Sequence, residues 1–504
     1  MGDATVLAAH HLNGREVIVA GGGITGLAAA FILSRHGARV TLLERDTAPP
    51  VGSASDAFTA WQRPGAPQVR HSHVFLGRLR NLLRDHYPDL LTALLAAGAR
   101  ELRATERPPL PLAGLQPEPG DDDLVILACR RTTFEWVLRQ RVLAGGGVTL
   151  VSGATVTGLL ATRSAPPVIA GVRYRLDGVE HLRRAHLVVD ASGRRSAAPE
   201  WLAAIGARPP QEKQEPSGIV YYTRFYRMRR TAMEPAPGAH PSANDFTWVK
   251  YAVFPADDGT FSITLAVPLA VPRLKVLAQA TAFDTMVHAI PGLAPWVAPE
   301  VSEPIGDLQR PVQAMGGLIN RRRRFVDRHG PLALRLFVLG DAAYCTNPLY
   351  GRGCAQGFLH AHLLAKALRE HPDDPAAAAV ALDRRARAEI EPFYRASILA
   401  DREAVSRAEN RPPVEWQARA WQQFLEKGIM VAMRCDPVVF RAMLRMMNML
   451  ETPEQAFTNP RVVARTLLVM ARGERYSRRV APPPPPDREA TIRRCERAVA
   501  AARV

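Results

Sequence analysis

A glycine-rich turn followed by an acidic residue has the clearest chemistry in this sequence. Gly21, Gly23 and Gly26 form a G-x-G-x-x-G pattern between the apolar run 17–20 and a segment with helical spacing. Glu44 ends the next apolar run, 18 residues after Gly26. The glycines permit a tight turn, close approach to a pyrophosphate and close helix–strand packing, and the acid can accept from ribose hydroxyls. The pattern therefore predicts a dinucleotide site that either FAD or NAD would fit.

The elements that must position this site follow from hydrophobic periodicity. Apolar runs predict buried strands at 17–20, 39–43 and 334–339, and helical spacing predicts helices at 130–143 and 358–369. The last strand delivers a Gly-Asp pair directly before a loop and the second of these helices. Several separated segments are thus expected to meet at one edge of a parallel sheet.

The middle of the chain differs in character from its flanks. Segments 218–227, 247–254 and 260–267 read as strands of an antiparallel sheet, and the sequence is helical from about residue 373 onward. Their aromatic residues suggest one wall of a binding pocket, although alternation along a strand lets only about half of them face it.

A predicted helix at 70–83 carries His71 and His73 at its start. Residues two apart do not share a helix face, so this pair is not predicted to bind a metal ion. Two alternatives stay open for these imidazoles. They either cap the helix and pack in the core, or they lie at the edge of a cofactor.

The composition is that of an ordinary globular chain and narrows the function classes. Of the 504 residues, 47% are hydrophobic and 22% are charged, and the formal net charge is +17. The excess arginines are scattered, and the one dense cluster, 321–324, has no interleaved aromatic residues, so no nucleic-acid partner is predicted. Five widely spaced cysteines predict neither a disulfide framework nor a metal site. With no apolar run long enough to span a membrane, we expect a cytoplasmic protein without a transmembrane segment.

Three motifs together resemble a known family. They are the glycine turn with Glu44, the segment VVDASGRRS at 188–196 and the segment LGDAAYCTNPLYGRG at 339–353. In this order they resemble the FAD-dependent aromatic hydroxylases and their relatives, the flavin-dependent epoxidases and halogenases. The resemblance spans roughly residues 15–370 and favours FAD over NAD. It implies an α/β fold in which a Rossmann-type FAD-binding domain is interleaved with an antiparallel-sheet substrate domain, followed by a helical C-terminal region.

The resemblance also implies roles for individual residues. Arg131 matches the family arginine that reaches the flavin phosphate or ribityl region, and Asp341 would accept from the ribityl chain. The segment 348–353 would pass the isoalloxazine ring, with its residues as candidates for the flavin edge: Pro348, Tyr350 and Gly351. The cofactor-binding residues implied are Gly21, Gly22, Gly23, Ile24, Thr25, Gly26, Glu44, Arg45, Arg131, Asp341, Gly351, Gly353 and Cys354. No catalytic acid or base is predicted.

Departures from the family patterns separate its branches. Tyr344 stands where aromatic hydroxylases commonly carry a histidine, and Asp190-Ala191 stands where their Asp-Gly commonly occurs. Both differences favour the epoxidase and halogenase branches. However, no lysine precedes Lys213, and 248–255 reads WVKYAVFP in place of the halogenase Trp-x-Trp-x-Ile-Pro signature. These two absences argue against a halogenase.

The resemblance implies a monooxygenase that inserts one oxygen atom into an apolar or aromatic substrate through a flavin C4a-(hydro)peroxide. The partners would be molecular oxygen and a small organic substrate, with NAD(P)H as a transient reductant or a separate flavin reductase. The pocket candidates are Tyr222, Trp248 and Phe254. The alternatives are a FAD-dependent dehydrogenase or double-bond reductase and a non-catalytic flavin-binding protein. A monomer and a homodimer both stay open.

The predicted domain organisation follows these motifs. The FAD-binding domain is discontinuous and comprises 15–200 and 325–372, with room for an excursion near 76–122. Residues 201–324 form the substrate domain, and 373–480 form the helical C-terminal region. Residues 481–504 make a proline-rich spacer and a terminal helix.

Overall fold

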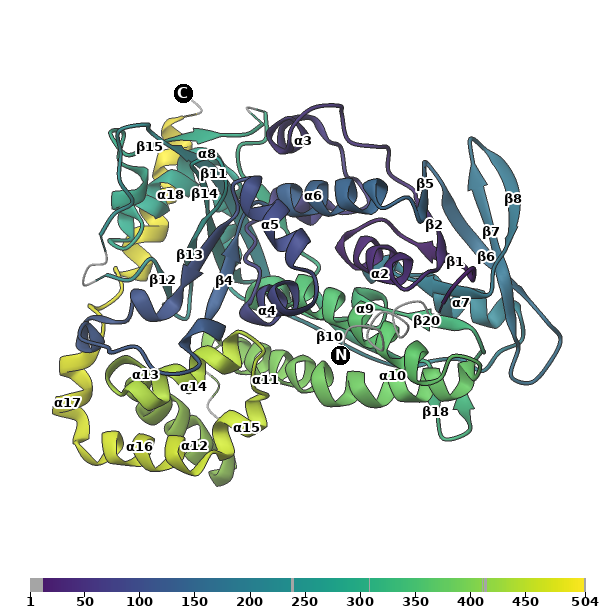
Figure 1. Ribbon diagram of the computed structural model, residues 1–504. Coiled ribbons are helices and arrows are strands. Elements are labelled where there is room, and N and C mark those ends of the chain that lie inside the picture. Colours follow the sequence, from purple (N-terminus) through teal and green to yellow (C-terminus); the bar gives the residue numbers. More distant parts are fainter. Residues whose placement is uncertain (1–11, 237–239, 308, 410, 412–414, 503–504) are drawn as a thin grey trace.

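The computed structural model describes residues 12–236, 240–307, 309–409, 411 and 415–502. It confirms the predicted fold class, with a parallel Rossmann-type sheet, antiparallel sheets and a helical C-terminal region. In Figure 1 the parallel sheet lies right of centre, the middle sheet at upper left and the C-terminal helices at lower left. In the described part of the chain, no helix is long and apolar enough to cross a membrane.

The parallel sheet carries the glycine turn. Its strand order is β20-β9-β1-β2-β5, and every neighbouring pair is parallel. Helices α2 (Ile24–Arg35) and α9 (Arg352–Glu370) pack closely together, since a Cβ added to Gly357 would lie 2.1 Å from Thr25 Oγ1. Both helices begin at the carboxyl edge of the sheet. The five strands are β1 (Glu16–Ala20), β2 (Arg39–Glu44), β5 (Val148–Ser152), β9 (Leu187–Asp190) and β20 (Leu336–Val338).

The middle sheet is antiparallel and has two different faces. One face packs against α8 (Ala280–Ala289) and the terminal helix α18 (Arg488–Ala501) in an apolar core. In Figure 1, α18 is the yellow helix that returns beside α8. The other face turns toward the parallel sheet. Its strands are β11 (Ile219–Met228), β12 (Ala243–Asp245), β13 (Lys250–Pro255), β14 (Thr260–Pro268), β15 (Ser302–Ile305) and β16 (Gln313–Met315).

Two polar links hold the middle sheet against the parallel-sheet half. Asp257, in the turn between β13 and β14, accepts from the Arg130 backbone N–H at 2.7 Å and from Thr133 Oγ1 at 2.7 Å. These two residues flank the first turn of α6 (Arg131–Ala144). Asp257 therefore holds the start of α6 from another part of the chain, beside its first residue, Arg131.

The segment for which an excursion near 76–122 is predicted contains α4 (Gly77–His86), α5 (Pro88–Ala96) and β3 (Arg100–Arg103), and β4 (Val125–Ala128) follows it. The helix predicted at 70–83 is wrong in its first part, because α4 begins at Gly77. Residues 71–76 are irregular, and Phe75 exchanges backbone hydrogen bonds with Leu127 of β4. This pairing outweighs the local helical spacing.

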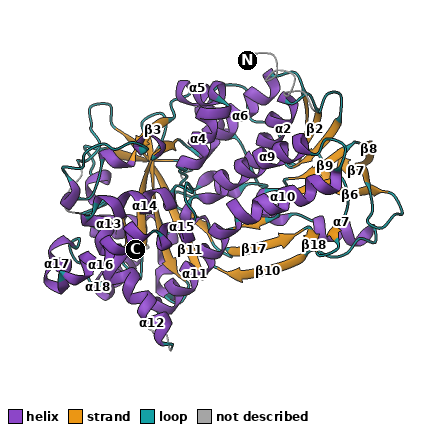
Figure 2. Ribbon diagram, turned by 60° about the horizontal axis from the view of Figure 1, so that its bottom comes forward, coloured by secondary structure: helices purple, strands orange, loops and turns teal. Residues whose placement is uncertain are grey.

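The C-terminal third consists of helices that cover one side of the site. Figure 2 shows α11 beside the paired strands β10 (Gln211–Pro216) and β17 (Ile319–Arg324), of which β17 also pairs with β21 (Tyr344–Cys345). The helices are α10 (Pro375–Glu389), α11 (Glu391–Ala408), α12 (Trp416–Gln423), α13 (Met430–Cys435), α14 (Pro437–Met447), α15 (Pro453–Thr458), α16 (Pro460–Ala471) and α17 (Gly473–Val480).

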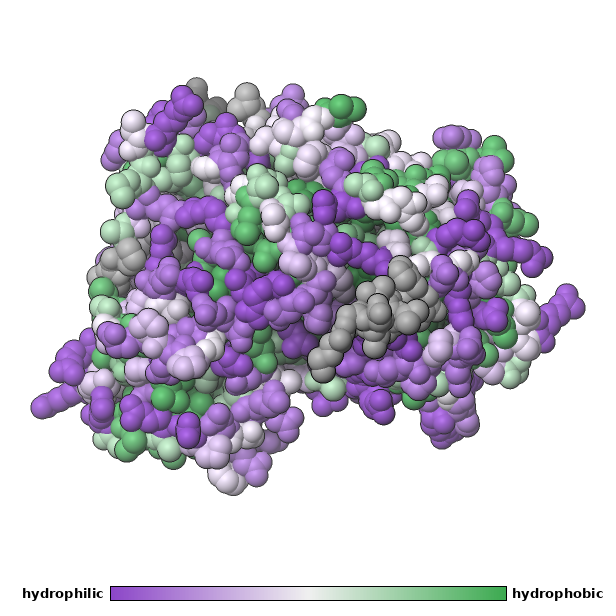
Figure 3. Space-filling view, viewed as in Figure 1, coloured by the Kyte–Doolittle hydropathy of each residue, from purple (hydrophilic) through white to green (hydrophobic). Residues whose placement is uncertain are grey.

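The remaining helices and strands lie outside the two main sheets. On the face seen in Figure 3, hydrophilic side chains predominate and apolar ones occur in small separate groups. The further elements are α3 (Ala54–Ala60), α7 (Ala198–Ala204), β6 (Thr155–Ala161), β7 (Ile169–Leu176), β8 (Val179–Arg184), β18 (Val326–Asp327) and β19 (Gly330–Pro331).

Candidate functional site

A cavity of about 750 Å³ extends from the carboxyl edge of the parallel sheet to the inner face of the middle sheet. Its wall includes Gly23 and Glu44 at one end and Tyr221 and Thr264 at the other, with Met447 of α14 among the C-terminal contributors. Segments of all three predicted regions therefore meet around one space. A dinucleotide and a small organic molecule would share this cavity if both were bound.

The glycine turn forms the first end of the cavity. Gly23 is the N-cap of α2, no side chain caps this helix, and its first turn contains no acidic residue. The free N–H groups and the positive end of the helix dipole therefore suit a phosphate. A Cβ at Gly23 would meet only Arg131 Nη2, at 3.9 Å. Of the predicted residues, those that line the cavity here are Gly21, Gly23, Ile24, Thr25, Glu44 and Arg45.

Two predicted glycines shape the turn without lining the cavity. The Gly22 N–H donates to Glu44 Oε2 at 2.6 Å and so holds the carboxylate at the end of β2. A Cβ at Gly26 would lie 1.7 Å from the carbonyl oxygen of Gly21. Gly26 is therefore required by the packing of α2 on the turn, and its contribution to the site is indirect.

Arg63 is a buried site residue that sequence reasoning missed. Its guanidinium lies 2.9 Å from Asp46, 2.6 Å from Glu135 and 3.4 Å from Glu44. The pKa of Arg63 is raised. Burial alone would lower it, but attraction to the three carboxylates, Glu135 first, has the larger effect. Arg63 lies in a stretch without periodicity or motif, so no local signal marks it.

Arg131, at the start of α6, and Asp341, after β20, both line the cavity. In each side chain, some hydrogen-bonding capacity is left without a protein partner. Arg131 lies 3.4 Å from Glu135 and 3.8 Å from Cys354 Sγ, and its Nε has no hydrogen-bond partner. Asp341 has no hydrogen-bond or ion-pair partner within the described residues, and burial raises its pKa despite the nearby arginines. A cation and an acceptor left open in this way fit the phosphates and ribityl hydroxyls of FAD.

The turn expected at the flavin edge is tied to the C-terminal region. Asn347 accepts a hydrogen bond from the Tyr221 hydroxyl and donates through Nδ2 to Asp401 Oδ1 at 2.7 Å. Asp401, on α11, also accepts from Asn320 Nδ2 at 2.6 Å, and burial raises its pKa. Asp401 and Asn320 belong to no sequence motif. All predicted site residues of this segment line the cavity, namely Pro348, Tyr350, Gly351, Gly353 and Cys354. Thr346, Leu349 and Arg352 line it as well and were not predicted.

The inner face of the middle sheet corrects two pocket predictions. Tyr221, Thr223 and Phe254 line the cavity, as predicted for Phe254. Tyr222 and Trp248 instead lie in the apolar core on the opposite face and do not line it. Side chains alternate along β11, so Tyr222 points away when its neighbours Tyr221 and Thr223 point in. The sequence does not reveal which of the two faces is covered by α18.

His71 and His73 line the cavity beside this face. His71 Nδ1 lies 3.0 Å from Thr223 Oγ1, and His73 Nδ1 lies 2.9 Å from the His71 carbonyl oxygen. Burial lowers the pKa of His71 to about 4. Burial, followed by repulsion from Arg131, lowers the pKa of His73 to about 3. Both rings are thus enclosed by protein and line the cavity, and a position at the edge of a cofactor stays a prediction.

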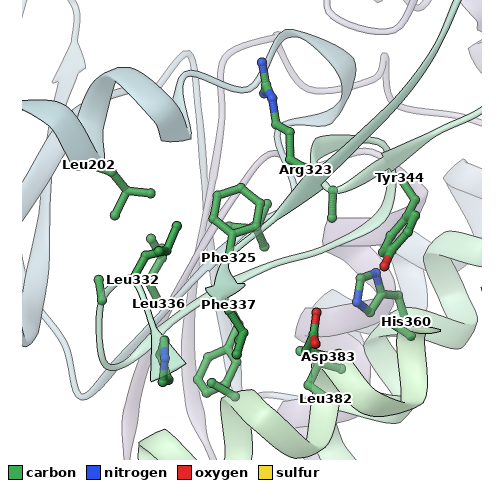
Figure 4. A pocket seen from close by; sticks show the side chains of 17 residues that line it. Leu202, Arg323, Phe325, Leu332, Leu336, Phe337, Tyr344, His360, Leu382 and Asp383 are labelled. Carbon is green, nitrogen blue, oxygen red and sulfur yellow. The ribbon is translucent and has the colours of Figure 1, made fainter. Parts of the chain in front are cut away.

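A second cavity, of about 50 Å³, lies behind the Gly-Asp motif in the core of the parallel-sheet half. Figure 4 shows Tyr344, His360 and Asp383 gathered on one side of it and apolar residues on the other. Tyr344, which stands where aromatic hydroxylases commonly carry a histidine, thus lines this small cavity and not the large one. The smaller space holds no more than a few water molecules and offers no site for an organic ligand.

Comparisons with known proteins agree with this geometry. Residues 16–124 match the FAD dependent oxidoreductase family. Protein Rv3254 of Mycobacterium tuberculosis is 28% identical over 374 residues, which cover 70% of this chain and 73% of that protein. The myxobacterial chondrochloren halogenase CndH has a TM-score of 0.59 at 18% identity, covering 92% of this chain and 99% of that one. PqsL, a probable FAD-dependent monooxygenase from Pseudomonas aeruginosa, has a TM-score of 0.55 at 17% identity, covering 81% of this chain and 99% of that one. The structural likeness shows a shared fold.

Proposed function

We propose that this chain is a FAD-dependent monooxygenase, since residues 16–124 match the FAD dependent oxidoreductase family and the fold is shared with solved structures of a halogenase and a probable monooxygenase. It would insert one oxygen atom from O₂ into an apolar or aromatic organic substrate, by hydroxylation or epoxidation. The observation that carries this proposal is the single cavity lined by both the glycine turn and the inner face of the middle sheet. Bound FAD, once reduced, supplies the activation of oxygen.

The chain's own groups would hold the cofactor at three places. The N-terminus of α2 would take the pyrophosphate, Glu44 the ribose hydroxyls, and Asp341 with Arg131 the ribityl and phosphate groups. Gly351, which has a left-handed φ of +64°, is the N-cap of helix α9, and no side chain caps this helix. Its free N–H groups would stabilise negative charge on the reduced isoalloxazine edge.

The C-terminal helices and the excursion would exclude water from the substrate half. Leu444 and Met447 of α14 line the cavity opposite the middle sheet. Arg441, on the same helix, lies 2.8 Å from Asp121 and 3.0 Å from Glu118 of the excursion. These ion pairs would hold α14 and the excursion together over the cavity. A site from which water is excluded protects an oxygen-transfer reaction from side reactions.

We further propose that reducing equivalents come from NAD(P)H, bound transiently, or from a partner reductase. The sequence contains no second strand–GxGxxG–helix unit that would give the nicotinamide a resident site. The absence of a lysine before Lys213 supports oxygen transfer to carbon over halogenation.

Isotopic labelling tests the proposal. The purified holoprotein is supplied with NADH, NADPH or a flavin reductase and a panel of apolar aromatic and olefinic compounds under labelled O₂. We expect one labelled oxygen atom in a product from at least one class. Anaerobic reduction or oxidation of a panel member, with no label incorporated in air, would replace the proposal with a dehydrogenase or reductase.

A further inference from the structure

A strip of histidine and hydroxyl side chains forms part of the wall of the substrate half, and the proposed function does not use it. The strip is defined here by its cavity-lining members His71, Ser72, His73, Thr223 and Thr264. It lies beside the turn expected at the flavin edge, because Val74 Cγ1 is 3.0 Å from the place where a Cβ on Gly351 would lie. A ligand near the flavin ring would therefore contact this strip.

The hydrogen bonds of His73 define its tautomer. Its Nδ1 lies 2.9 Å from the carbonyl oxygen of His71, and a carbonyl can only accept, so Nδ1 carries the proton. In the neutral ring, Nε2 is then an unprotonated acceptor. Within the described residues, no protein group hydrogen-bonds to Nε2, which leaves this nitrogen for a ligand in the cavity.

A chain of hydroxyl groups defines the tautomer of His71 in the same way. Thr264 Oγ1 donates to Ser72 Oγ at 2.7 Å, and Thr223 Oγ1 lies 2.8 Å from Thr264 Oγ1. Each hydroxyl has one proton, so Thr223 must donate to Thr264 and must accept from His71 Nδ1, 3.0 Å away. The chain ends at Ser262, 2.7 Å from Ser72. His71 Nε2 is therefore also an unprotonated acceptor.

The surroundings keep both rings neutral. His71 and His73 are deeply enclosed by protein, and burial lowers the pKa of each well below 6.5, to about 4 and about 3. Arg131 disfavours a positive charge on His73 further. No carboxylate is hydrogen-bonded to either ring in the described part of the chain. The pair therefore offers two acceptors and no negative charge.

We propose that His71 and His73 bind the substrate through their Nε2 atoms, and that the substrate is a neutral apolar skeleton carrying a hydroxyl or N–H donor. This inference rests on the proposed function and deepens it by naming the groups that orient the acceptor of the oxygen atom. An unpaired acceptor in a dry cavity is costly, so an analogue without the donor should bind more weakly, by roughly 10- to 100-fold.

A matched pair of probes tests the proposal on the oxidised holoenzyme, without turnover. 2-Naphthol carries a hydroxyl donor. In 2-methoxynaphthalene a methyl group replaces the hydrogen atom of that hydroxyl group, so the oxygen stays but the donor is lost. Each is titrated while the flavin absorbance spectrum is followed. We expect the wild-type protein to bind naphthol about 10- to 100-fold more tightly than the ether.

Two substitutions at one position separate ligand binding from a structural role. The amide of Asn reaches the place of Nδ1 and can still donate to the His71 carbonyl, whereas the amide oxygen of Gln reaches the place of Nε2. We expect His73→Asn to lose the preference for naphthol and His73→Gln to retain most of it. A structural role predicts the opposite order. Flavin content and thermal stability are measured for each variant to confirm folding.

Each outcome decides one claim. Equal binding of the two probes by the wild-type protein, or no binding of either, overturns the inference, as does an unchanged preference in His73→Asn. Failure of oxygen transfer with an intact naphthol preference would overturn the proposed monooxygenase activity alone. Oxygen transfer without any donor preference would overturn only the role of the histidine pair.

Discussion

At the scale of single residues, glycines of one motif have different physical roles. Gly23 has an extended φ of −77° and open space on its cavity side, whereas Gly26 has the Gly21 carbonyl oxygen in the place of a side chain. Gly23 therefore leaves room for the ligand, whereas Gly26 is needed for the packing of the fold. The motif alone does not separate these roles, because both positions read simply as glycine.

This difference gives a prediction for FAD retention. Gly23→Ala should fold normally and bind FAD at least about 10-fold more weakly, because the added methyl group lies where the pyrophosphate must approach the backbone. Gly26→Ala should instead lower the expression or the thermal stability of the protein, since the clash is with backbone. Flavin content after dialysis and the unfolding temperature of the apoprotein measure the two effects. Full flavin loading of Gly23→Ala would contradict the placement of the pyrophosphate.

At the scale of elements, the C-terminal helix α11 does more than cover the site. Its Asp401 accepts from the side chains of Asn347 and Asn320 and so connects the helix to the turn at the expected flavin edge. The sequence could not predict this connection, because it joins residues far apart in the chain. Local periodicity located most strands and helices, but not residues 71–76, whose pairing with β4 is also non-local. It also missed the first six residues of α9, which begins at Arg352 and not at the predicted residue 358.

Replacing Asp401 by Ala should lower the free energy of unfolding by roughly 2–4 kcal/mol, because two buried amide donors lose their acceptor. The matched control is Arg402→Ala, next in sequence on the same helix, whose ion pair with Glu215 is solvent-exposed. This control should cost less than about 1 kcal/mol. Denaturant unfolding of both variants measures the difference. Equal effects would show that the Asp401 connection does not stabilise the turn.

At the scale of the whole molecule, three segments distant in sequence enclose one cavity, and their motifs were visible in the sequence. The fold class and most of the cofactor end could be predicted, since glycine spacing and buried strands are local signals. The substrate end could not, because the face of the middle sheet that looks inward is decided by α18, which packs on the other face from the far end of the chain. This is why Tyr222 and Trp248 were assigned to the wrong side.

Buried histidines should make the whole fold sensitive to acid. Burial lowers the pKa of His71, His360 and His362 from 6.5 to about 4. Between these values the three histidines bind more protons in the unfolded chain than in the folded chain, so their contribution to the free energy of unfolding should fall as the pH is lowered from 6.5 to 4. The unfolding temperature across this range measures the effect. His360→Asn should make the decrease toward pH 4 smaller than in the wild-type protein, whereas a substitution at the exposed His329 should leave it unchanged. Equal profiles of the wild-type and His360→Asn proteins would contradict the contribution of the buried ring.

The most direct measurement is rapid mixing of the anaerobically reduced holoprotein with oxygenated buffer while the flavin absorbance is followed. We expect a transient species with an absorbance distinct from both reduced and oxidised flavin, with its decay accelerated by a substrate that carries a hydroxyl or N–H group. Direct and slow return to oxidised flavin, unchanged by any such compound, would contradict oxygen activation in this cavity.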